Sequence, residues 1–262
     1  MEGNGVSSLA MTSLLAIDVG NSDTKLGLFE GEELVEDWRI STGWGRTKDE
    51  HLHLLSGLLG DRRPDAAAIA SVVPPAIGAL RVAVDELVEG EVLGLEAGVR
   101  TGMAVVVDNP RDVGADRIAN AVAARSMYGT PVVVVDMGTV TTFDVIDADG
   151  RYIGGAIAPG VRAAIEASVD STATLRRVEL EAPENIIGKS TEEAMQAGHL
   201  WGFVGLVSGL LDGISAELGT DCPVVATGGL SGLIAPGVSR ITARDRFLTL
   251  RGIREVWEKN QG

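Results

Sequence analysis

The chain has 262 residues, 45% of them hydrophobic, so it can fill the core of one large domain or two ordinary ones. Its 22 basic and 37 acidic residues give a net charge of −15, which disfavours DNA, RNA and anionic lipid as partners. The single cysteine, Cys222, excludes an intrachain disulfide and a multi-cysteine zinc site. No apolar run approaches the ~20 residues of a membrane span, and no basic stretch precedes an apolar one at the start. We therefore expect a cytoplasmic protein that binds neither nucleic acid nor membrane, with residues 1–12 as a flexible extension.

From residue 13 onward, strand-like and helix-like segments alternate. An aliphatic run that ends at Asp18 predicts a buried strand, and two further strands follow in a meander. Leucines at 52, 55, 58 and 59 have helical spacing, and Pro74-Pro75 closes the next apolar strand. The expected segments are strands at 14–18, 26–29, 34–40, 66–73 and 92–95, and helices at 46–59 and 77–88. This order predicts an α/β unit with a hairpin lead-in.

The second half repeats the same plan. An Ala-rich helix follows Pro110 and stops at Gly129, because Pro ends an extended stretch and Gly ends a helix. The segments expected after it are strands between 132 and 157, helices at 161–168 and 191–218, and a strand at 224–227.

One short pattern occurs twice, 118 positions apart. In each copy an aliphatic run ends in Asp, Gly is the second residue beyond it, and Thr stands four residues after the Gly; the matched residues are Asp18, Gly20 and Thr24, and Asp136, Gly138 and Thr142. Gly lets the backbone approach a ligand, while the hydroxyls and amides that follow can cradle phosphate oxygens. The pattern favours a duplicated phosphate-binding element. The alternative is two unrelated hairpins of similar composition.

A third candidate segment lies between the two copies. Asp116 falls in the first turns of the Ala-rich helix, with Asn120 one turn later on the same face. Asp116 could merely complement the helix dipole, an effect of ~0.3–1 kcal/mol. The small residues Gly114 and Ala115 before it instead favour a closely fitting substrate.

Taken together in order, these segments resemble type III pantothenate kinase over nearly the whole chain beyond residue 13. The motifs are Asp18-Val-Gly-Asn-Ser, Asp108-Asn-Pro, Gly114-Ala-Asp-Arg117, Asp136-Met-Gly-Thr, Gly154-Gly-Ala-Ile-Ala-Pro-Gly160, Gly188-Lys-Ser-Thr191 and Thr227-Gly-Gly-Leu-Ser231. That family belongs to the actin, sugar-kinase and Hsp70 superfamily. The resemblance implies two duplicated actin-like (ribonuclease H-like) α/β domains, residues 13–125 and 126–262, with an ATP cleft between them and a last helix that could pack back on the first domain.

The resemblance also implies an activity and its site. The reaction is ATP-dependent phosphorylation of pantothenate to 4′-phosphopantothenate, the first step of coenzyme A synthesis, with Mg²⁺, a K⁺ or NH₄⁺ ion and a homodimer. Asp116 would be the proton acceptor, Asp136 the ligand of the monovalent cation, and Asp18 a candidate Mg²⁺ ligand. The residues implied to bind ATP are Asp18, Val19, Gly20, Asn21, Ser22, Asp23, Thr24, Lys25 and Thr139, and those implied to bind pantothenate are Gly114, Ala115, Asp116, Arg117 and Thr191.

One departure from the family pattern bears on ATP. Asp23 stands where the family usually has a neutral residue, so it must face a metal, Lys25 or solvent to be tolerated near phosphates. Two alternative functions follow: a non-catalytic nucleotide-binding regulator on the same fold, or a kinase of another small alcohol.

Overall fold

The computed structural model describes residues 12–96, 98–170 and 178–261, which divide into two compact units. The first unit ends before residue 98, and the second runs from Gly98 to Asn260. The division falls at 97/98, closer to the N-terminus than the expected boundary at 125/126. The reason is that the helix that contains Asp116 packs on the sheet of the second unit. Residues 1–11 lie outside the described part of the chain, so the expected extension stays a prediction.

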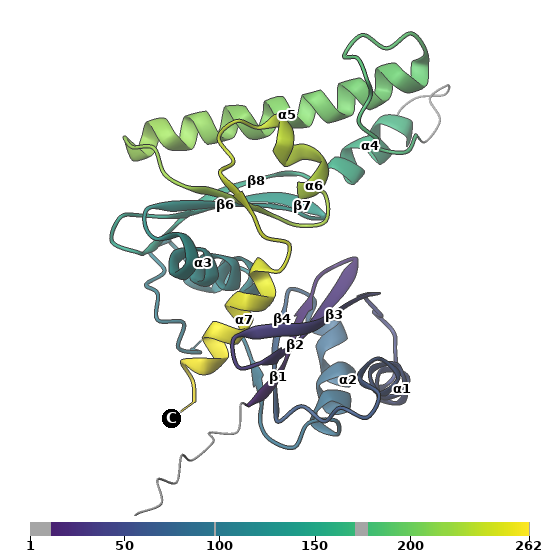
Figure 1. Cartoon of the computed structure of the whole chain (residues 1–262), viewed down its shortest axis with the longest axis vertical. Helices are drawn as coiled ribbons and strands as arrows, with labels where there is room; N and C mark the ends of the chain where they lie inside the picture. Colours follow the sequence, from purple (N-terminus) through teal and green to yellow (C-terminus); the bar gives the residue numbers. More distant parts are fainter. Residues whose placement is uncertain (1–11, 97, 171–177, 262) are drawn as a thin grey trace, which may run out of the picture. The chain divides into compact units, whose positions relative to one another are not determined.

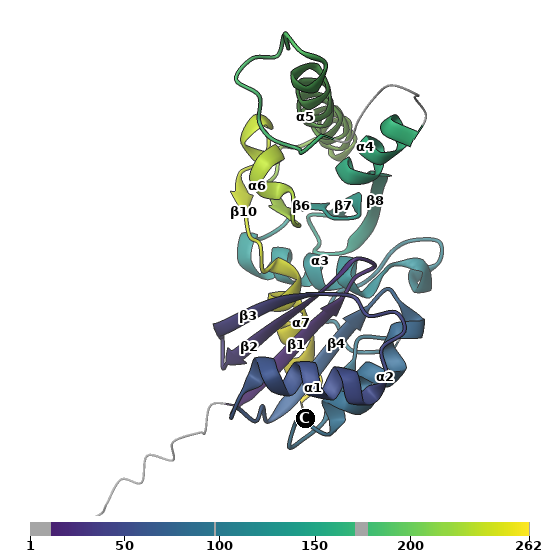
Figure 2. The same cartoon turned by 90° about the vertical axis from the view of Figure 1, so that its right-hand side faces the viewer.

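The first unit is a five-stranded sheet with two helices on one face (Figure 2). Its strands are β1 (Ser13–Val19), β2 (Asp23–Glu30), β3 (Glu33–Ser41), β4 (Ala66–Ser71) and β5 (Val92–Gly94), in the order β3-β2-β1-β4-β5. The helices are α1 (Lys48–Leu59) and α2 (Pro74–Asp85). Thr47 and Glu50 form a capping box that fixes the start of α1. The two prolines do not only close β4; they also begin α2, where a missing N–H costs nothing.

The second unit has a five-stranded sheet of the same strand arrangement, with different helices packed on it (Figure 1). Its strands are β6 (Val132–Met137), β7 (Val140–Ile146), β8 (Tyr152–Pro159), β9 (Val224–Thr227) and β10 (Ala243–Arg244), in the order β10-β9-β6-β7-β8. Its helices are η1 (Pro110–Asp112), α3 (Ala115–Tyr128), α4 (Val161–Asp170), α5 (Thr191–Leu218), α6 (Ser231–Ile234), η2 (Ala235–Gly237) and α7 (Leu248–Glu258).

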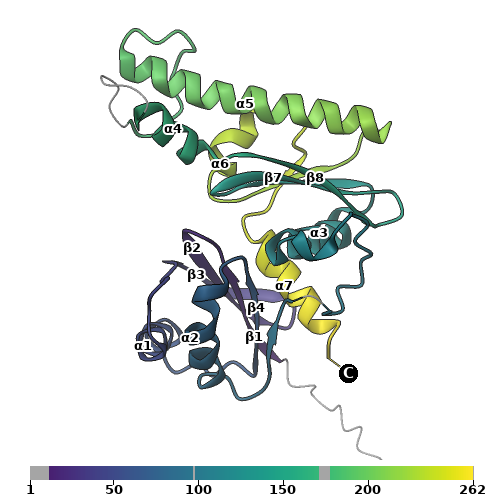
Figure 3. The same ribbon diagram turned by 180° about the vertical axis from the view of Figure 1, so that it is seen from behind.

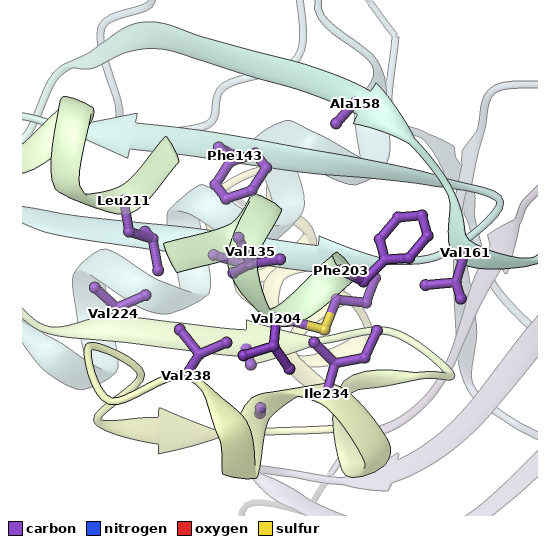
Figure 4. Packing of buried hydrophobic residues seen from close by; sticks show 14 of the residues in the cluster. Val135, Phe143, Ala158, Val161, Phe203, Val204, Leu211, Val224, Ile234 and Val238 are labelled. Atoms are coloured by element: carbon purple, nitrogen blue, oxygen red, sulfur yellow. The ribbon is translucent and has the colours of Figure 1, made fainter. Parts of the chain in front are cut away.

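The two faces of the second sheet carry different side chains because successive strand residues point to opposite sides. Val135, Phe143 and Val224 point toward α5, where they pack with Phe203 and Leu211 in the main core of this unit (Figure 4). The residues between them in the strands point toward α3. That second face carries Asp136, Thr142, Asp144 and Thr227.

Helix α3 lies beside α7 (Figure 3). The two backbones approach so closely that a Cβ added to Gly252 of α7 would lie 1.9 Å from the carbonyl oxygen of Ala119. Small residues at this crossing fix the position of α3 over the sheet, and so the position of the residues in its first turn.

The duplication is confirmed by two features that the sheets share. Each has three antiparallel strands followed by two parallel ones, and each has a register shift at the same place in its second strand, after Leu28 and after Val145. The turn between the first two strands differs, since residues 20–23 separate Val19 from its partner Thr24, whereas residues 138–140 separate Met137 from its partner Thr141. Thr24 therefore corresponds to Thr141, and the match with Thr142 expected from spacing is wrong by one residue.

Candidate functional site

The first turn of the first unit places Asp18 and Lys25 face to face. They are direct partners in the β1–β2 register, and the Lys25 ammonium lies 3.2 Å from Oδ2 of Asp18. Asp18 is only 5% exposed, so the ion pair compensates the cost of burying its carboxylate. Asp18 and Val19 are thus held rigidly at the end of β1.

The turn itself is held by hydrogen bonds that leave only part of it open. The Gly20 N–H donates to the Asp23 carbonyl at 3.0 Å, and the Thr42 hydroxyl donates to the Gly20 carbonyl at 2.7 Å. Because the Thr42 proton is used there, the buried Thr24 hydroxyl, 3.1 Å away, is the donor to Thr42. Thr24 therefore supports the turn from inside rather than facing a ligand.

Asn21 and Ser22 are the exposed residues of this turn. The Trp44 indole N–H donates to the Asn21 carbonyl at 2.9 Å, and the Thr42 N–H donates to the Ser22 carbonyl at 2.9 Å. Both backbone carbonyls therefore already accept hydrogen bonds from the protein. Asn21 and Ser22 are the most exposed residues of this turn, and Asp23 is partly exposed.

Asp23 has a partner that the sequence did not indicate. Its carboxylate forms an ion pair with Arg39 of the neighbouring strand β3, and this contact raises the pKa of Arg39. Lys25, one of the three expected environments beside a metal and solvent, forms an ion pair with Asp18. The extra negative charge of Asp23 is thus offset within the turn.

The second turn, Gly138–Val140, is exposed over its whole length. Thr139 lies at its tip, and Gly160 lies directly beneath it, since a Cβ on Gly160 would come within 2.0 Å of the Thr139 carbonyl oxygen. Glycine at 160 allows this turn to approach the start of α4, and the side chain of Thr139 faces outward.

Asp116 lies in the first turn of α3. Gly114 is the N-cap of the helix, with Ala115 next, and the Arg117 N–H donates to Oδ1 of Asp116 at 2.8 Å. This places a carboxylate among the N–H groups of a helix start. Asp116 is half-buried, so it combines a fixed position with access to a ligand.

Asp136 lies on the face of the sheet that α3 covers. It faces Asn120, which is one helical turn after Asp116 on α3. Asn120, fully buried on α3, donates from Nδ2 to Oδ2 of Asp136 at 3.1 Å. Thr227 is the register partner of Asp136 on β9 and is also fully buried. Neither Asn120 Oδ1 nor Thr227 Oγ1 has a hydrogen-bond partner within the described residues. Gly228 presses on the same carboxylate, because an added Cβ would lie 2.5 Å from Oδ1 of Asp136.

Arg117 is bound to a second buried carboxylate. Its Nε donates to Oδ1 of Asp144 at 2.7 Å, the Tyr152 hydroxyl donates to the same oxygen at 2.7 Å, and the Thr142 hydroxyl lies 3.2 Å from Oδ2. Burial raises the pKa of Asp144, and the charge of Arg117 together with these hydrogen bonds opposes that rise. Burial and the charge of Asp144 raise the pKa of Tyr152, whose phenol therefore stays protonated.

Sequence reasoning missed Asp144 and Tyr152, although a signal was present. Asp144 interrupts the apolar run Phe143-Asp-Val-Ile146, and a carboxylate inside a buried strand requires a cation or several donors.

Thr191 is the first residue of α5 and is exposed, after the N-cap Ser190. Its role in binding pantothenate stays a prediction. The described parts of the chain contain no group of three or more His, Cys, Asp or Glu side chains able to hold a metal ion.

Comparison with known proteins identifies the family of the chain. Residues 14–213 match the model of the family described as type III pantothenate kinase. The type III pantothenate kinase of Frankia casuarinae is 46% identical over 248 residues, covering 94% of this chain and 99% of the relative. That of a Roseiflexus species is 47% identical over 253 residues, covering 95% and 99%.

Among solved structures, a putative Baf family transcriptional activator from Campylobacter jejuni is similar with a TM-score of 0.60 and 19% identity, covering 94% of this chain and 98% of that one. The activator of 2-hydroxyisocaproyl-CoA dehydratase from Clostridium difficile, with bound ADPNP, has a TM-score of 0.52 and 13% identity, covering 95% and 97%. These two share the fold, while the sequence matches carry the assignment: the chain belongs to the type III pantothenate kinase family.

Proposed function

We infer that this chain is a kinase that transfers the γ-phosphoryl group of ATP to pantothenate, yielding 4′-phosphopantothenate for coenzyme A synthesis. The family match over residues 14–213 supports the substrate and the reaction. The observation within the structure that supports it best is the half-buried Asp116 carboxylate, fixed in the first turn of α3 beside Arg117.

Asp116 would act as the general base. It takes the proton of the primary hydroxyl of pantothenate while that oxygen bonds to the γ-phosphorus of ATP. The bond from the γ-phosphorus to the bridging oxygen then breaks, and ADP leaves with the electron pair. Phosphoryl transfer depends mainly on positioning and charge stabilisation, so one well-held carboxylate is sufficient chemistry for the protein to supply.

The remaining site residues would bind the two substrates. We assign the phosphate contacts to the turn of Asp18, Val19, Gly20, Asn21, Ser22, Asp23, Thr24 and Lys25 and to Thr139, with Asn21, Ser22 and Thr139 facing the ligand and Thr24 supporting the turn. We assign pantothenate to Gly114, Ala115, Arg117 and Thr191. The exposure of Asn21, Ser22 and Thr139 supports the assignment of these three residues to the ligand.

Asp18 is the candidate Mg²⁺ ligand, and carboxylate oxygen is the donor that Mg²⁺ prefers. A single carboxylate at this turn fits an ion that is held mostly by nucleotide phosphates and water. Bound Mg²⁺ would neutralise charge on the phosphates of ATP.

Asp136 is the candidate ligand of a K⁺ or NH₄⁺ ion. The buried oxygens of Asn120 and Thr227, which lack partners in the described residues, support this assignment, because an oxygen-rich site next to a carboxylate suits a monovalent cation. The cation would offset part of the negative charge of the triphosphate.

We also propose that the protein acts in the cytoplasm. By length and composition α5 is the one helix among the described residues that could cross a membrane, yet Leu200, Val207 and other apolar side chains of α5 pack on the sheet as in a core helix.

We further propose that the protein is a homodimer that associates through α5. The outer face of α5 carries a row of exposed glycines with open space around them, at 198, 202, 205, 209 and 213. Glycine destabilises a helix by ~0.5–1 kcal/mol relative to Ala, so a repeated row indicates close approach of another helix.

The dimer is tested by light scattering on the wild type and on Gly205→Glu. We expect a dimeric mass for the wild type and a monomeric mass for the variant, with unchanged circular dichroism. A monomeric wild type at micromolar concentration would contradict the proposal.

The reaction is tested by incubating the purified chain with ATP, Mg²⁺ and pantothenate, and measuring phosphopantothenate by mass spectrometry, with and without K⁺ or NH₄⁺. A panel of other small alcohols serves as the control for acceptor identity. Turnover of pantothenate at least tenfold above every other acceptor is expected. Phosphorylation of another alcohol in preference to pantothenate would contradict the assignment.

A further inference from the structure

The side chain of Arg117 is held from the sheet by one fully buried acid. Arg117 is 16% exposed in its side chain and Asp144 is 0% exposed, and the contact between them uses Nε of the guanidinium. Because this bond uses Nε, the two terminal nitrogens Nη1 and Nη2 are the atoms of the guanidinium that can bind a planar anionic group. A carboxylate, such as the one that pantothenate carries, is a group of that kind.

Asp144 is in turn fixed by two hydroxyls. The Tyr152 hydroxyl shares Oδ1 with Arg117, and the Thr142 hydroxyl contacts Oδ2, so both oxygens of the acid are engaged. The Tyr152 ring also lies 5.9 Å from the guanidinium carbon of Arg117, within the range of a cation–π contact. The carboxylate therefore cannot rotate without losing several contacts at once.

Tyr152 connects this cluster to the chain that leads into α3. Its backbone N–H donates to the Ala104 carbonyl at 2.9 Å, and its carbonyl accepts from the Val106 N–H at 2.8 Å. The segment ahead of Asp116 and the side chain next to Asp116 are thus both anchored on the same buried tyrosine.

The fold itself does not require an acid at this position. In the first unit Gly27 occupies the equivalent place, since it pairs with Ala16 as Asp144 pairs with Val134. One copy of the sheet thus folds with glycine where the other buries a carboxylate. A buried charge that the architecture can do without suggests a role in the site that Arg117 belongs to.

We propose that Asp144 and Tyr152 are positioning residues that hold the Arg117 guanidinium, and with it the first turn of α3, in the orientation that binds pantothenate. The proposal rests on the proposed function for the identity of the substrate. It assigns Asp144 and Tyr152 no contact with the reacting atoms.

The kinetic test compares Asp144→Asn, Tyr152→Phe and the control Asp149→Asn. The control makes the same change at an exposed pair, because the side chain of Asp149 is 71% exposed and lies 3.1 Å from Arg151 in a surface turn. We expect Asp144→Asn to raise the KM for pantothenate about tenfold or more and Tyr152→Phe to raise it about two- to fivefold, as for loss of a charge-assisted and a neutral hydrogen bond. The KM for ATP should change less than about twofold in all three, and the control should match the wild type.

A double-mutant cycle separates positioning from a general structural role. In an Arg117→Gln background, Asp144→Asn should raise the KM for pantothenate by less than about twofold, because the residue it acts through is gone. An equal factor in both backgrounds, or a wild-type KM in folded Asp144→Asn, would overturn the proposal. If Asp144→Asn does not fold, Tyr152→Phe gives the same decision with the charge retained.

An NMR measurement tests the same contact without activity. The Nε–H resonance of Arg117, assigned by its loss in Arg117→Lys, should exchange slowly in the wild type and rapidly in Asp144→Asn. An unchanged resonance would overturn the positioning role even if pantothenate is the substrate. A wild type that fails to phosphorylate pantothenate, with the resonance behaving as expected, would overturn the proposed function and leave the Asp144–Arg117 contact supported.

Discussion

Replacing Gly228 by Ala should disturb Asp136 through a purely steric route. Gly228 has a φ of +89°, and an added Cβ would lie 2.5 Å from Oδ1 of Asp136 and 2.6 Å from the backbone nitrogen of Met137. The carboxylate is flexible, but the Met137 backbone is part of β6 and cannot move aside without distorting the strand. The substitution should therefore cost stability and displace the Asp136 carboxylate together.

The size of the effect follows from two contributions. A positive φ costs a non-glycine residue ~1–2 kcal/mol. Overpacking against a rigid backbone adds ~1–3 kcal/mol. We expect Gly228→Ala to lower the free energy of unfolding by about 2–5 kcal/mol in total. If Asp136 binds the cation as proposed, the variant should also need a higher K⁺ concentration for half-maximal activity.

Gly219→Ala is the matched control. Gly219 ends α5 with a φ of +67° and has no atom within 4 Å of an added Cβ, so it carries the conformational cost without the steric one. Urea unfolding followed by circular dichroism compares the two variants with the wild type. If Gly228→Ala and Gly219→Ala destabilise the protein equally within ~0.5 kcal/mol, the close approach at Asp136 is not rigid and the reasoning fails.

Three further changes test separate parts of the site. Asp23→Asn should lower the KM for ATP a few-fold, and Arg39→Gln should raise it by leaving Asp23 uncompensated; a raised KM in Asp23→Asn would show that the carboxylate helps to bind ATP. Asp136→Ala should remove most activity along with its dependence on K⁺ or NH₄⁺, whereas equal wild-type rates in Na⁺ and K⁺ buffers would exclude the cation from the mechanism. Burial lowers the pKa of His51 in the folded protein. The contribution of His51 to stability is therefore complete above the ordinary pKa of 6.5 and is lost as the pH falls below 6.5. His51→Leu should reduce the fall in Tm between pH 7.5 and 5.5, and an unchanged fall would contradict this.

The sequence predicted the three-stranded meander at the start of each unit and the repeated turns, because both depend on local patterns. Apolar runs that end in Asp, followed by Gly, are visible without tertiary information, and both turns are where they were expected. The equivalence of Thr24 was misjudged by one residue, since spacing along the chain does not show that the second turn is shorter. Only the pairing of strands reveals that Thr141 takes its place.

Partners across elements could not be predicted in the same way. Asp23 was expected to face Lys25, a metal or solvent, but it forms an ion pair with Arg39. Arg39 lies on β3 two residues from Ser41, the register partner of Asp23, and a single sequence does not show that pairing. Asp144 and Tyr152 come together with Arg117 because α3 packs on the β7 side of the sheet, and that packing depends on residues as remote as Gly252 of α7.

The role of Asp116 is tested most directly by single-turnover phosphorylation of pantothenate with the wild type and Asp116→Asn. The amide keeps the shape of the side chain and can still accept the Arg117 N–H, but it cannot take the hydroxyl proton. A positioned general base contributes ~10²–10⁴-fold, so we expect a loss of that size in turnover, with a much smaller change in pantothenate affinity and an unchanged Tm. A folded variant that retains more than about half of the wild-type turnover would show that Asp116 only stabilises the start of α3, and would contradict its assignment as the base.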